Sequence, residues 1–414
     1  TDVVLMYLES FGNPRKFARL TRRLGRRKPI IVINSGAGMV VPGLQESSVE
    51  LPEVSAQALF EESGVIRVET VSGMFDVALL LTSQPLPTGD RVAVVGNSTA
   101  LGVLVTNACR ANGLSMARLE DVGVQGSAAA FEPALRAAVD DPGVDSVVVV
   151  FVPPLQRTAG QDVAEALRAV AATSAKPILS TFLGFEGMPE ALAAEGESAP
   201  ARGSVPSYPS PERAVRALAR AVRYAAWRER PPSSVPQLDR IDLPAARALV
   251  EGVLAEGEGR TLSTEETGRL LGTVGIVLSY EAPAETVEVE YSVFDDHSFG
   301  ALVSFGVGGV ATALLGDTVY AAAPLTTDGA AELIAAPRAA PLLTGYQGSE
   351  PCDTAALADL ALRLSALGDA LPELAELTLA ALAAPFGAQV TAASARVAPP
   401  SARGDSGPRR MRGL

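Results

Sequence analysis

Continuous runs of apolar residues alternate with amphipathic helical segments over the first 230 residues, and this pattern constrains the fold most. A run at residues 3–8 (VVLMYL) is followed by a basic helical segment and a second run at residues 28–33 (KPIIVI). The same unit recurs as residues 147–152 (VVVVFV) and 176–182 (KPILSTF), with a helix over 163–171 between them. Strands that are apolar on both faces are typical of parallel sheets covered by helices on both sides. The sequence therefore predicts an α/β protein with two related parallel-sheet domains.

Each copy of the unit continues into a short extended segment that leads into a helix. These segments are residues 64–68 before a helix over 71–81, and residues 204–208 before a helix over 212–227. Ser210 and Pro211 suit the N-cap and the first position of the second helix. Its period predicts Val215, Leu218 and Val222 as buried, and four arginines as exposed: Arg213, Arg216, Arg220 and Arg223. Residues 91–95 (RVAVV) predict a further strand ahead of the second copy.

The last third of the chain has a different, α+β pattern. A Pro/Ser-rich linker precedes helices over 244–254 and after Ser263, where Glu266 completes a capping box. Strands are predicted over 287–294, 301–305 and 390–397, and helices over 329–334 and 354–367. The predicted domains are therefore 1–88 and 89–230, both flavodoxin-like, a linker over 231–243, a domain over 244–397 and a disordered tail over 398–414.

Charge and composition exclude several classes of protein. The net charge of −13 argues against a general nucleic-acid binder, because phosphate contacts need a basic face. The longest apolar run has the length of a strand, far below the roughly 20 residues of a membrane span. Two cysteines fit a reducing cytosol, and Cys109 has the setting of a small core residue. We therefore expect a cytoplasmic protein, and because Thr1 leads at once into a strand, a further N-terminal part before it.

Several short motifs carry a resemblance to a known family. In the first 90 residues they are 3–11 (VVLMYLESF), 64–68 (GVIRV), 75–80 (FDVALL) and 84–87 (QPLP). Past the linker they are 298–300 (SFG), 303–310 (VSFGVGGV) and 323–326 (APLT). From residue 1 to about residue 397 the sequence resembles the ADP-forming acyl-CoA synthetases, relatives of succinyl-CoA synthetase. The sequence of the first copy is most similar to that of actinobacterial members fused to a GNAT-type lysine acetyltransferase.

The resemblance implies an architecture and a set of cofactors. In such enzymes a Rossmann domain binds CoA, and two flavodoxin-like domains follow it. One of these carries a histidine that passes phosphate between an acyl phosphate and ADP, and an ATP-grasp domain holds the nucleotide with Mg²⁺. The resemblance thus implies ATP or ADP, Mg²⁺ and CoA as cofactors, and places the CoA-binding domain before Thr1.

The chain departs from the family at the phosphate-relaying position. Alignment back from residues 58–60 places Gln45 where the family has its phosphohistidine. A primary amide is a poor nucleophile and does not titrate near neutral pH, so Gln45 cannot relay phosphate. The single histidine, His297, is expected to be an exposed turn residue. Glu9 resembles a family glutamate that steadies the phosphohistidine; without that histidine, a plain strand-end carboxylate explains it equally.

The ATP-grasp part departs as well. Residues 276–286 connect Gly275 directly to Val287, where the family has a long insert with a lysine that contacts the nucleotide phosphates. The resemblance aligns three places with the family's acidic and metal-binding positions: Ala313, residues 378–382 (TLAAL) and Ser394. Mg²⁺ requires oxygen ligands, and alanine side chains supply none, so we predict no metal site. Gly308, Gly309 and Asp317 remain as a residual nucleotide site.

A residual anion site is predicted at residues 95–100 (VGNSTA), which join a strand to the start of a helix. Backbone N–H groups and the side chains of Asn97, Ser98 and Thr99 could hold a phosphate there, with Glu9 nearby. This segment resembles the helix that points at the phosphohistidine in the family, without the family's paired glycines. A capped helix start explains the same residues, and we favour that interpretation.

Three functions remain open on the sequence. The first is a catalytically degenerate, regulatory acyl-CoA-synthetase-like module, with missing CoA-binding and acetyltransferase domains as partners and an acyl-CoA or nucleotide as effector. The second is an active acetate/acyl–CoA ligase subunit that needs a separate CoA-binding chain. The third is a two-lobed ligand-binding protein, against which the lack of a signal peptide counts. Replacement of the histidine and the metal ligands together favours the first.

Overall fold

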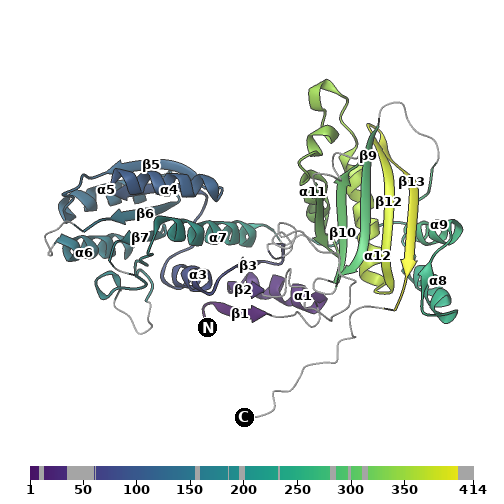
Figure 1. The fold of residues 1–414 in the computed structure, drawn as a ribbon, viewed down its shortest axis with the longest axis horizontal. Coiled ribbons are helices and arrows are strands. Elements are labelled where there is room, and N and C mark those ends of the chain that lie inside the picture. The colour runs from purple at the N-terminus through teal and green to yellow at the C-terminus, as the bar shows by residue number, and fades with distance from the viewer. Residues whose placement is uncertain are drawn as a thin grey trace, which may run out of the picture. The chain divides into compact units, whose positions relative to one another are not determined.

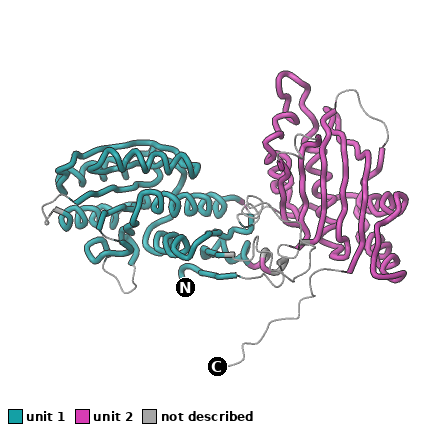
Figure 2. The backbone as a smooth tube through the Cα atoms, viewed as in Figure 1, with its two compact units in different colours: residues 1–9, 21–36, 60–230 teal, residues 10–20, 37–59, 231–414 magenta. Residues whose placement is uncertain are grey.

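The computed structural model describes residues 1–8, 14–34, 60, 62–153, 159–184, 186–194, 201–231, 234–279, 286–296, 300–309 and 316–399. The predictions for Glu9, Gln45, His297 and Ala313 lie outside these residues. The chain divides into two compact units (Figure 2): unit 1 contains residues 1–9, 21–36 and 60–230, and unit 2 contains residues 10–20, 37–59 and 231–414. Among the described residues, no helix has both the length and the apolar composition needed to cross a bilayer.

Unit 1 begins with a three-stranded parallel sheet of order β1-β2-β3 (Figure 1). Its strands are β1 (Val4–Leu8), β2 (Ile30–Asn34) and β3 (Val65–Val68), with the helix α3 (Val71–Ser83) and the last residues of α1 (Pro14–Gly25), whose first residues belong to unit 2. Strands β2 and β3 are almost fully buried where described, as expected for parallel strands, and β3 includes the buried Arg67. Thr70 caps α3 by accepting a hydrogen bond from the N–H of Gly73.

A second, four-stranded parallel sheet follows, of order β5-β4-β6-β7. Its strands are β4 (Arg91–Gly96), β5 (Ser115–Asp121), β6 (Ser146–Phe151) and β7 (Ile178–Phe182). The helices are α4 (Thr99–Ala111), α5 (Ala128–Asp140), α6 (Ala159–Ala171), the short η1 (Glu190–Leu192) and α7 (Pro211–Glu229). Helices α4 and α7 share a core with one face of the sheet, and α5 and α6 with the other. The predicted doubly covered parallel sheet is confirmed.

Helix α7 begins as predicted, with Ser210 as its N-cap and Pro211 in its first turn. The prediction of four exposed arginines is wrong for two of them. The guanidinium of Arg213 donates to both carboxylate oxygens of Asp76 on α3, at 2.7 and 2.8 Å. The side chain of Arg220 is only 12% exposed, because α7 packs against the first sheet, a contact that local periodicity does not reveal.

The far end of α7 also binds the first sheet's layer. The hydroxyl of Tyr224 donates to the carbonyl oxygen of Gly25 at 2.6 Å, and Trp227 Nε1 donates to the carbonyl oxygen of Glu62 at 3.2 Å. Gly64 lies directly under the indole ring of Trp227. Helix α7 therefore contributes to joining the two parallel sheets of unit 1, by apolar contact, hydrogen bonds and ion pairs.

Unit 2 contains a six-stranded sheet of order β11-β10-β9-β12-β13-β8, antiparallel throughout (Figure 1). The strands are β8 (Arg260–Thr261), β9 (Val287–Asp296), β10 (Gly300–Val307), β11 (Thr318–Ala322), β12 (Leu374–Ala384) and β13 (Gly387–Val397). The helices are α8 (Leu243–Ala255), α9 (Thr264–Gly272), α11 (Thr327–Ala335), η2 (Ala340–Leu343), η3 (Tyr346–Gly348) and α12 (Thr354–Ala370). The predicted capping box is present, with Ser263 and Glu266 bonding reciprocally at the start of α9.

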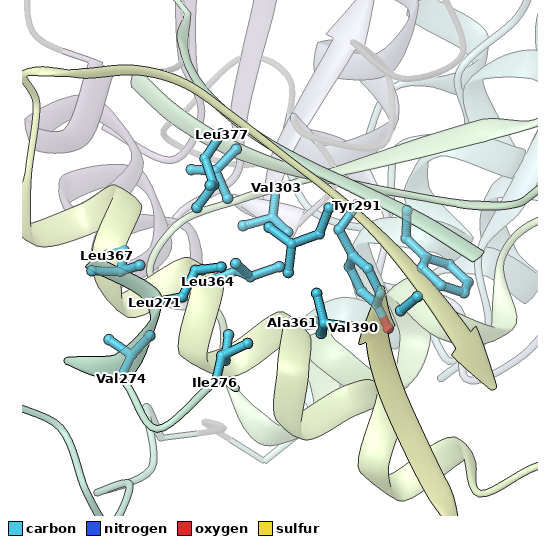
Figure 3. Close-up of a cluster of buried hydrophobic side chains, with 14 of the residues drawn as sticks. Leu271, Val274, Ile276, Tyr291, Val303, Ala361, Leu364, Leu367, Leu377 and Val390 are labelled. Atoms are coloured by element: carbon cyan, nitrogen blue, oxygen red, sulfur yellow. The ribbon is translucent and has the colours of Figure 1, made fainter. Parts of the chain in front are cut away.

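The helices of unit 2 cover one face of its sheet and form a single core with it (Figure 3). Tyr291 of β9 is buried in this core, and its hydroxyl donates to the carbonyl oxygen of Leu357 on α12 at 3.0 Å. Val303 and Leu377, on the neighbouring strands, point into the same core. Because side chains alternate along a strand, the residues that precede and follow each of these core residues face away from the helices. The α+β prediction for this part of the chain is confirmed.

Candidate functional site

The carboxyl ends of β4 and β6 form the natural ligand position of unit 1. From β4 the chain passes through α4 to β5 on one side, and then through α5 to β6 on the other. In a sheet of this kind, ligands bind where the strand order reverses, outside the carboxyl ends of the two central strands. The predicted anion-binding residues Asn97, Ser98 and Thr99 follow β4 directly, so the structure places them at this reversal point.

Asn97 is 2% exposed, and both polar atoms of its side chain are hydrogen-bonded within the chain. Its Nδ2 donates to the carbonyl oxygen of Val152 at 2.8 Å, and its Oδ1 accepts from the N–H of Val152 at 2.8 Å. This pair of hydrogen bonds closes the gap between the ends of β4 and β6. The Asn97 side chain thus bridges the carboxyl ends of the two central strands.

Ser98 and Thr99 are also hydrogen-bonded within the chain. Ser98 is the N-cap of α4, and its hydroxyl accepts from the N–H of Leu101 at 3.5 Å. The Thr99 hydroxyl donates to Oδ2 of Asp121, at the end of β5, and the N–H of Gly123 donates to Oδ1 of the same carboxylate at 2.9 Å. These two bonds, with the Thr99 bond the stronger cause, lower the pKa of Asp121 below its usual value.

An ionised carboxylate therefore lies beside the start of α4. The N-terminus of a helix favours negative charge, and Asp121 supplies that charge from within the chain. A phosphate approaching the same N–H groups would meet electrostatic repulsion from Asp121. Sequence reasoning did not identify Asp121, because it lies 22 residues beyond Thr99 on a strand that has no apolar run.

In unit 2, Gly308 and Gly309 follow the end of β10. The N–H of Gly308 donates to the carbonyl oxygen of Glu288 at 2.6 Å, and an added methyl at Gly308 would lie 2.8 Å from Cβ of Glu288. Gly309 has a φ of +110°, which side-chain-bearing residues rarely adopt. Both glycines are explained by the close approach and the turn of the backbone.

Asp317, the remaining acidic residue of the predicted nucleotide site, makes two structural hydrogen bonds. Its Oδ1 accepts from the N–H of Arg338 and its Oδ2 from the N–H of Ala339, each at 2.8 Å. Gly306 of β10 pairs with Thr318 of β11, so Gly308 and Asp317 lie at the same end of this hairpin. The carboxylate is therefore directed at the segment before η2.

The face of the sheet that points away from the helices carries a row of hydroxyl groups. The register aligns one hydroxyl residue from each of five neighbouring strands: Tyr320, Ser304, Ser292, Thr378 and Ser394. Two of them, Thr378 and Ser394, stand at positions that the family resemblance assigns to metal ligands. The next row on the same face contains a carboxylate, Glu290, between Gly306 and Ala380.

This arrangement does not fit a magnesium ion. Mg²⁺ in proteins is held mainly by carboxylates and phosphates, whereas the aligned row offers neutral hydroxyls. Burial raises the pKa of Tyr320, which keeps its phenol protonated. No group of three or more His, Cys, Asp or Glu side chains that could hold a metal occurs among the described residues.

Comparison with known proteins supports the same two folds. Residues 1–81 match the succinyl-CoA ligase like flavodoxin domain, and residues 255–398 match the ATP-grasp domain. The chain is homologous to the ADP-forming acyl-CoA synthetases. It is 25% identical to acetate–CoA ligase (ADP-forming) I of Archaeoglobus fulgidus, over 92% of this chain and 67% of that protein. It is 23% identical to 4-hydroxybutyrate–CoA ligase (ADP-forming) of Nitrosopumilus maritimus, over 92% of this chain and 68% of that protein.

In Pyrococcus furiosus the similarity is divided between two polypeptides of acetate–CoA ligase (ADP-forming) I. Its alpha subunit is 27% identical over 55% of this chain and 54% of its own length. Its beta subunit is 36% identical over 22% of this chain and 40% of its own length. The chain thus spans about two thirds, or less, of the relatives that it matches, and some relatives are built from separate subunits.

Proposed function

We propose that this chain is a catalytically degenerate, regulatory module of the ADP-forming acyl-CoA synthetase type. The observation that carries the proposal is the hydroxyl row on the face of the unit 2 sheet that points away from the helices. Thr378 and Ser394 supply neutral oxygens where the family resemblance calls for metal-binding acids, and the carboxylate of Asp317 already accepts two backbone hydrogen bonds. Gln45 at the phosphohistidine position is a second, independent reason.

The site in unit 1 supports the same proposal. The phosphate position at the start of α4 is supplied with an internal carboxylate, Asp121, and the gap between β4 and β6 is closed by Asn97. A protein that no longer binds phosphate at this point can keep its fold while its surface takes on another role. We propose that the role is regulatory: the chain senses an acyl-CoA or a nucleotide, as part of a longer cytoplasmic protein that also holds a CoA-binding domain and a lysine acetyltransferase.

A phosphorylation assay tests this proposal. The purified chain is incubated with γ-labelled ATP and Mg²⁺, and acid-labile phosphoprotein is measured. We expect no label on the chain itself or on the Gln45→His variant, because restoring the histidine does not restore the metal ligands. Label on Gln45→His alone would show that nucleotide and metal still bind productively, and would contradict the proposal.

Sensing is tested separately, by thermal unfolding with acetyl-CoA or ADP. A ligand that binds only the folded chain stabilises it by about 2.7 kcal/mol at one hundred times its Kd. A rise in Tm that saturates with ligand supports the effector role. An unchanged Tm at millimolar concentrations of both ligands would count against sensing by this part of the protein.

The alternative function is an active acetate/acyl–CoA ligase subunit that works with a separate CoA-binding chain. The division of the Pyrococcus furiosus relative into alpha and beta subunits favours it. Mixing the chain with that alpha subunit and measuring ATP-dependent acetyl-CoA formation distinguishes the two functions. Turnover that requires both chains, above that of the added subunit alone, would support the alternative.

A further inference from the structure

Two carboxylates lie on the face of the unit 2 sheet that points away from the helices. They belong to Glu288 and Glu290, alternate residues of β9, and both residues are exposed. The register places Glu290 between Gly306 of β10 and Ala380 of β12, so its neighbours on both sides are too small to cover it. Within the described part of the chain, neither carboxylate forms an ion pair. The face therefore carries negative charge that the fold does not neutralise.

The sequence around β9 supplies no cation that balances these carboxylates. Residues 270–337 contain nine acidic residues and no lysine or arginine. Residues 231–399 together contain 22 acidic and 7 basic residues. A strong excess of one charge raises the local concentration of ligands of the opposite charge and repels ligands of the same charge. This part of the chain consequently attracts cations and repels phosphates.

Next to the carboxylates, the fold leaves a buried hydroxyl without a hydrogen bond. Ser304 of β10 is 5% exposed, and its neighbours Val303 and Phe305 belong to the core on the helix side. Its side chain therefore points to the opposite face, where it aligns with Ser292 and, one strand further, with Thr378. Within the described ranges, none of these three hydroxyls is hydrogen-bonded to another residue. Buried polar groups normally have partners, so Ser304 indicates a partner from outside the chain.

A second acceptor without a partner lies on the carboxylate side of this row. Gln389 of β13 aligns with Leu382 of β12, which in turn aligns with Glu288 of β9. The Oε1 atom of Gln389 is buried and accepts no hydrogen bond from any residue that the structure describes. A buried acceptor without a donor destabilises the fold, so this oxygen also calls for a ligand that donates.

We propose that this face binds a guanidinium group, either that of an arginine side chain or that of a small guanidine compound. A guanidinium has five N–H donors and no acceptor, which matches a surface of carboxylates, an amide oxygen and hydroxyls that accept. An ammonium group offers only three donors and is more strongly hydrated, so it fits less well. The inference rests on the proposed loss of nucleotide chemistry, because phosphates on this face would meet Glu288 and Glu290.

Isothermal titration calorimetry of the full 414-residue chain tests the proposal, with Nα-acetylarginine amide as the ligand at about 50 mM salt. The citrulline counterpart, in which a neutral urea replaces the guanidinium, is the matched control ligand. We expect saturable binding of the arginine ligand that is at least about tenfold tighter than that of the citrulline ligand. Equal affinity for the two ligands, or no binding of the arginine ligand at about 10 mM, overturns the proposal.

Substitutions on and off the face locate the binding. Glu290→Gln removes a charge with little change of shape, and should weaken binding of the arginine ligand about tenfold. The control Glu251→Gln, at an exposed glutamate of α8, should change the affinity by less than about twofold. Ser304→Ala should weaken binding but leave Tm unchanged, because the hydroxyl has no partner within the described chain. An affinity that neither Glu290→Gln nor Ser304→Ala changes overturns the proposal.

Parallel titrations separate this inference from the proposed function. ATP with Mg²⁺ is titrated into the same protein. If neither the arginine ligand nor ATP binds, the inference is overturned and the proposed loss of ligase chemistry stands. If ATP with Mg²⁺ binds and Ser304→Ala weakens that binding, both are overturned. A tripeptide with a central arginine and blocked ends identifies the source of the guanidinium: tighter binding than the single residue supports a polypeptide ligand, and equal binding supports a small guanidine.

Discussion

Gly64 is the residue at which substitution should most clearly weaken unit 1. Its φ is +70°, and a methyl group added there would lie 2.2, 2.3 and 2.5 Å from three ring carbons of Trp227. The indole cannot move aside easily. Its Nε1 donates to Glu62, its ring stacks on Tyr224 at 6.2 Å between centroids, and the guanidinium of Arg26 lies 5.1 Å from its centre. We therefore expect the structure around Gly64 to shift in order to relieve the overlap, which lowers the free energy of unfolding of unit 1.

Two costs add in Gly64→Ala. The left-handed backbone costs a residue with a Cβ about 1–2 kcal/mol, and overpacking costs about 1–3 kcal/mol, so the loss is about 2–5 kcal/mol. The matched control is Gly113→Ala, because Gly113 has a φ of +73° but nothing within 4 Å of the added methyl. The control should lose only the backbone cost.

Urea unfolding followed by tryptophan fluorescence measures the difference. Trp227 is the only tryptophan of the chain, so the signal reports on unit 1. With a urea dependence of about 2 kcal/mol per molar, Gly64→Ala should lower the midpoint by about 1–2.5 M, and Gly113→Ala by about 0.5–1 M. If the two variants unfold at the same midpoint, the indole does not press on Gly64, and the account of how α7 joins the two sheets is refuted.

Three further predictions concern single residues of unit 1. Asn97→Ala should lower the free energy of unfolding in urea by about 1–3 kcal/mol, because it leaves the N–H and C=O of Val152 without the bonds that Asn97 makes. The control Asn112→Ala removes one bond at a helix end and should lower it less, and equal losses would contradict the bridging role of Asn97. The hydrogen bond from Arg91 lowers the pKa of Asp145, so the ionised carboxylate stabilises the fold above its unfolded pKa of about 3.9, and this stabilisation is lost as pH falls through the lower folded pKa. Asp145→Asn should therefore reduce Tm at neutral pH and make Tm fall less steeply below about pH 4. An unchanged dependence of Tm on pH would refute this. Burial raises the pKa of Cys109 to about 11, so a thiol reagent at pH 8 should modify Cys352 first and Cys109 only on unfolding. Rapid reaction of both thiols in the native protein would be inconsistent with the structure.

Local patterns were sufficient to predict the elements whose environment is uniform. The run at β6 is apolar on both sides because both faces of its sheet are covered, and the structure buries every residue of it. The capping box of Ser263 and Glu266 depends on residues three positions apart, so its chemistry is complete within the sequence. The α/β and α+β parts of the chain could also be distinguished from local patterns.

Other elements depend on contacts that the sequence does not display. Strand β12 (LAELTLAALAA) is composed largely of strong helix formers, yet pairing with β9 on one side and β13 on the other makes it a strand. Strand β5 escapes prediction because it lies at an edge and alternates charged with apolar residues. In both cases long-range pairing overrides local preference.

The candidate site shows the same division. The residues after β4 could be placed at a strand end from the sequence, but the groups that occupy their hydrogen bonds, Asp121 and Val152, come from other strands. The hydroxyl row in unit 2 is composed of one residue from each of five strands. Its alignment is set by the register of the sheet, which no single segment of sequence specifies.

The measurement that tests the central claim most directly is thioester formation by the chain alone. The purified chain is incubated with ATP, Mg²⁺, CoA and acetate, and acetyl-CoA is measured beside the Archaeoglobus fulgidus relative as a positive control. The account predicts no ATP-dependent acetyl-CoA above background for the chain. Sustained ATP-dependent turnover without any added subunit would contradict it, because the scaffold would then still perform the chemistry that its side chains are proposed to have lost.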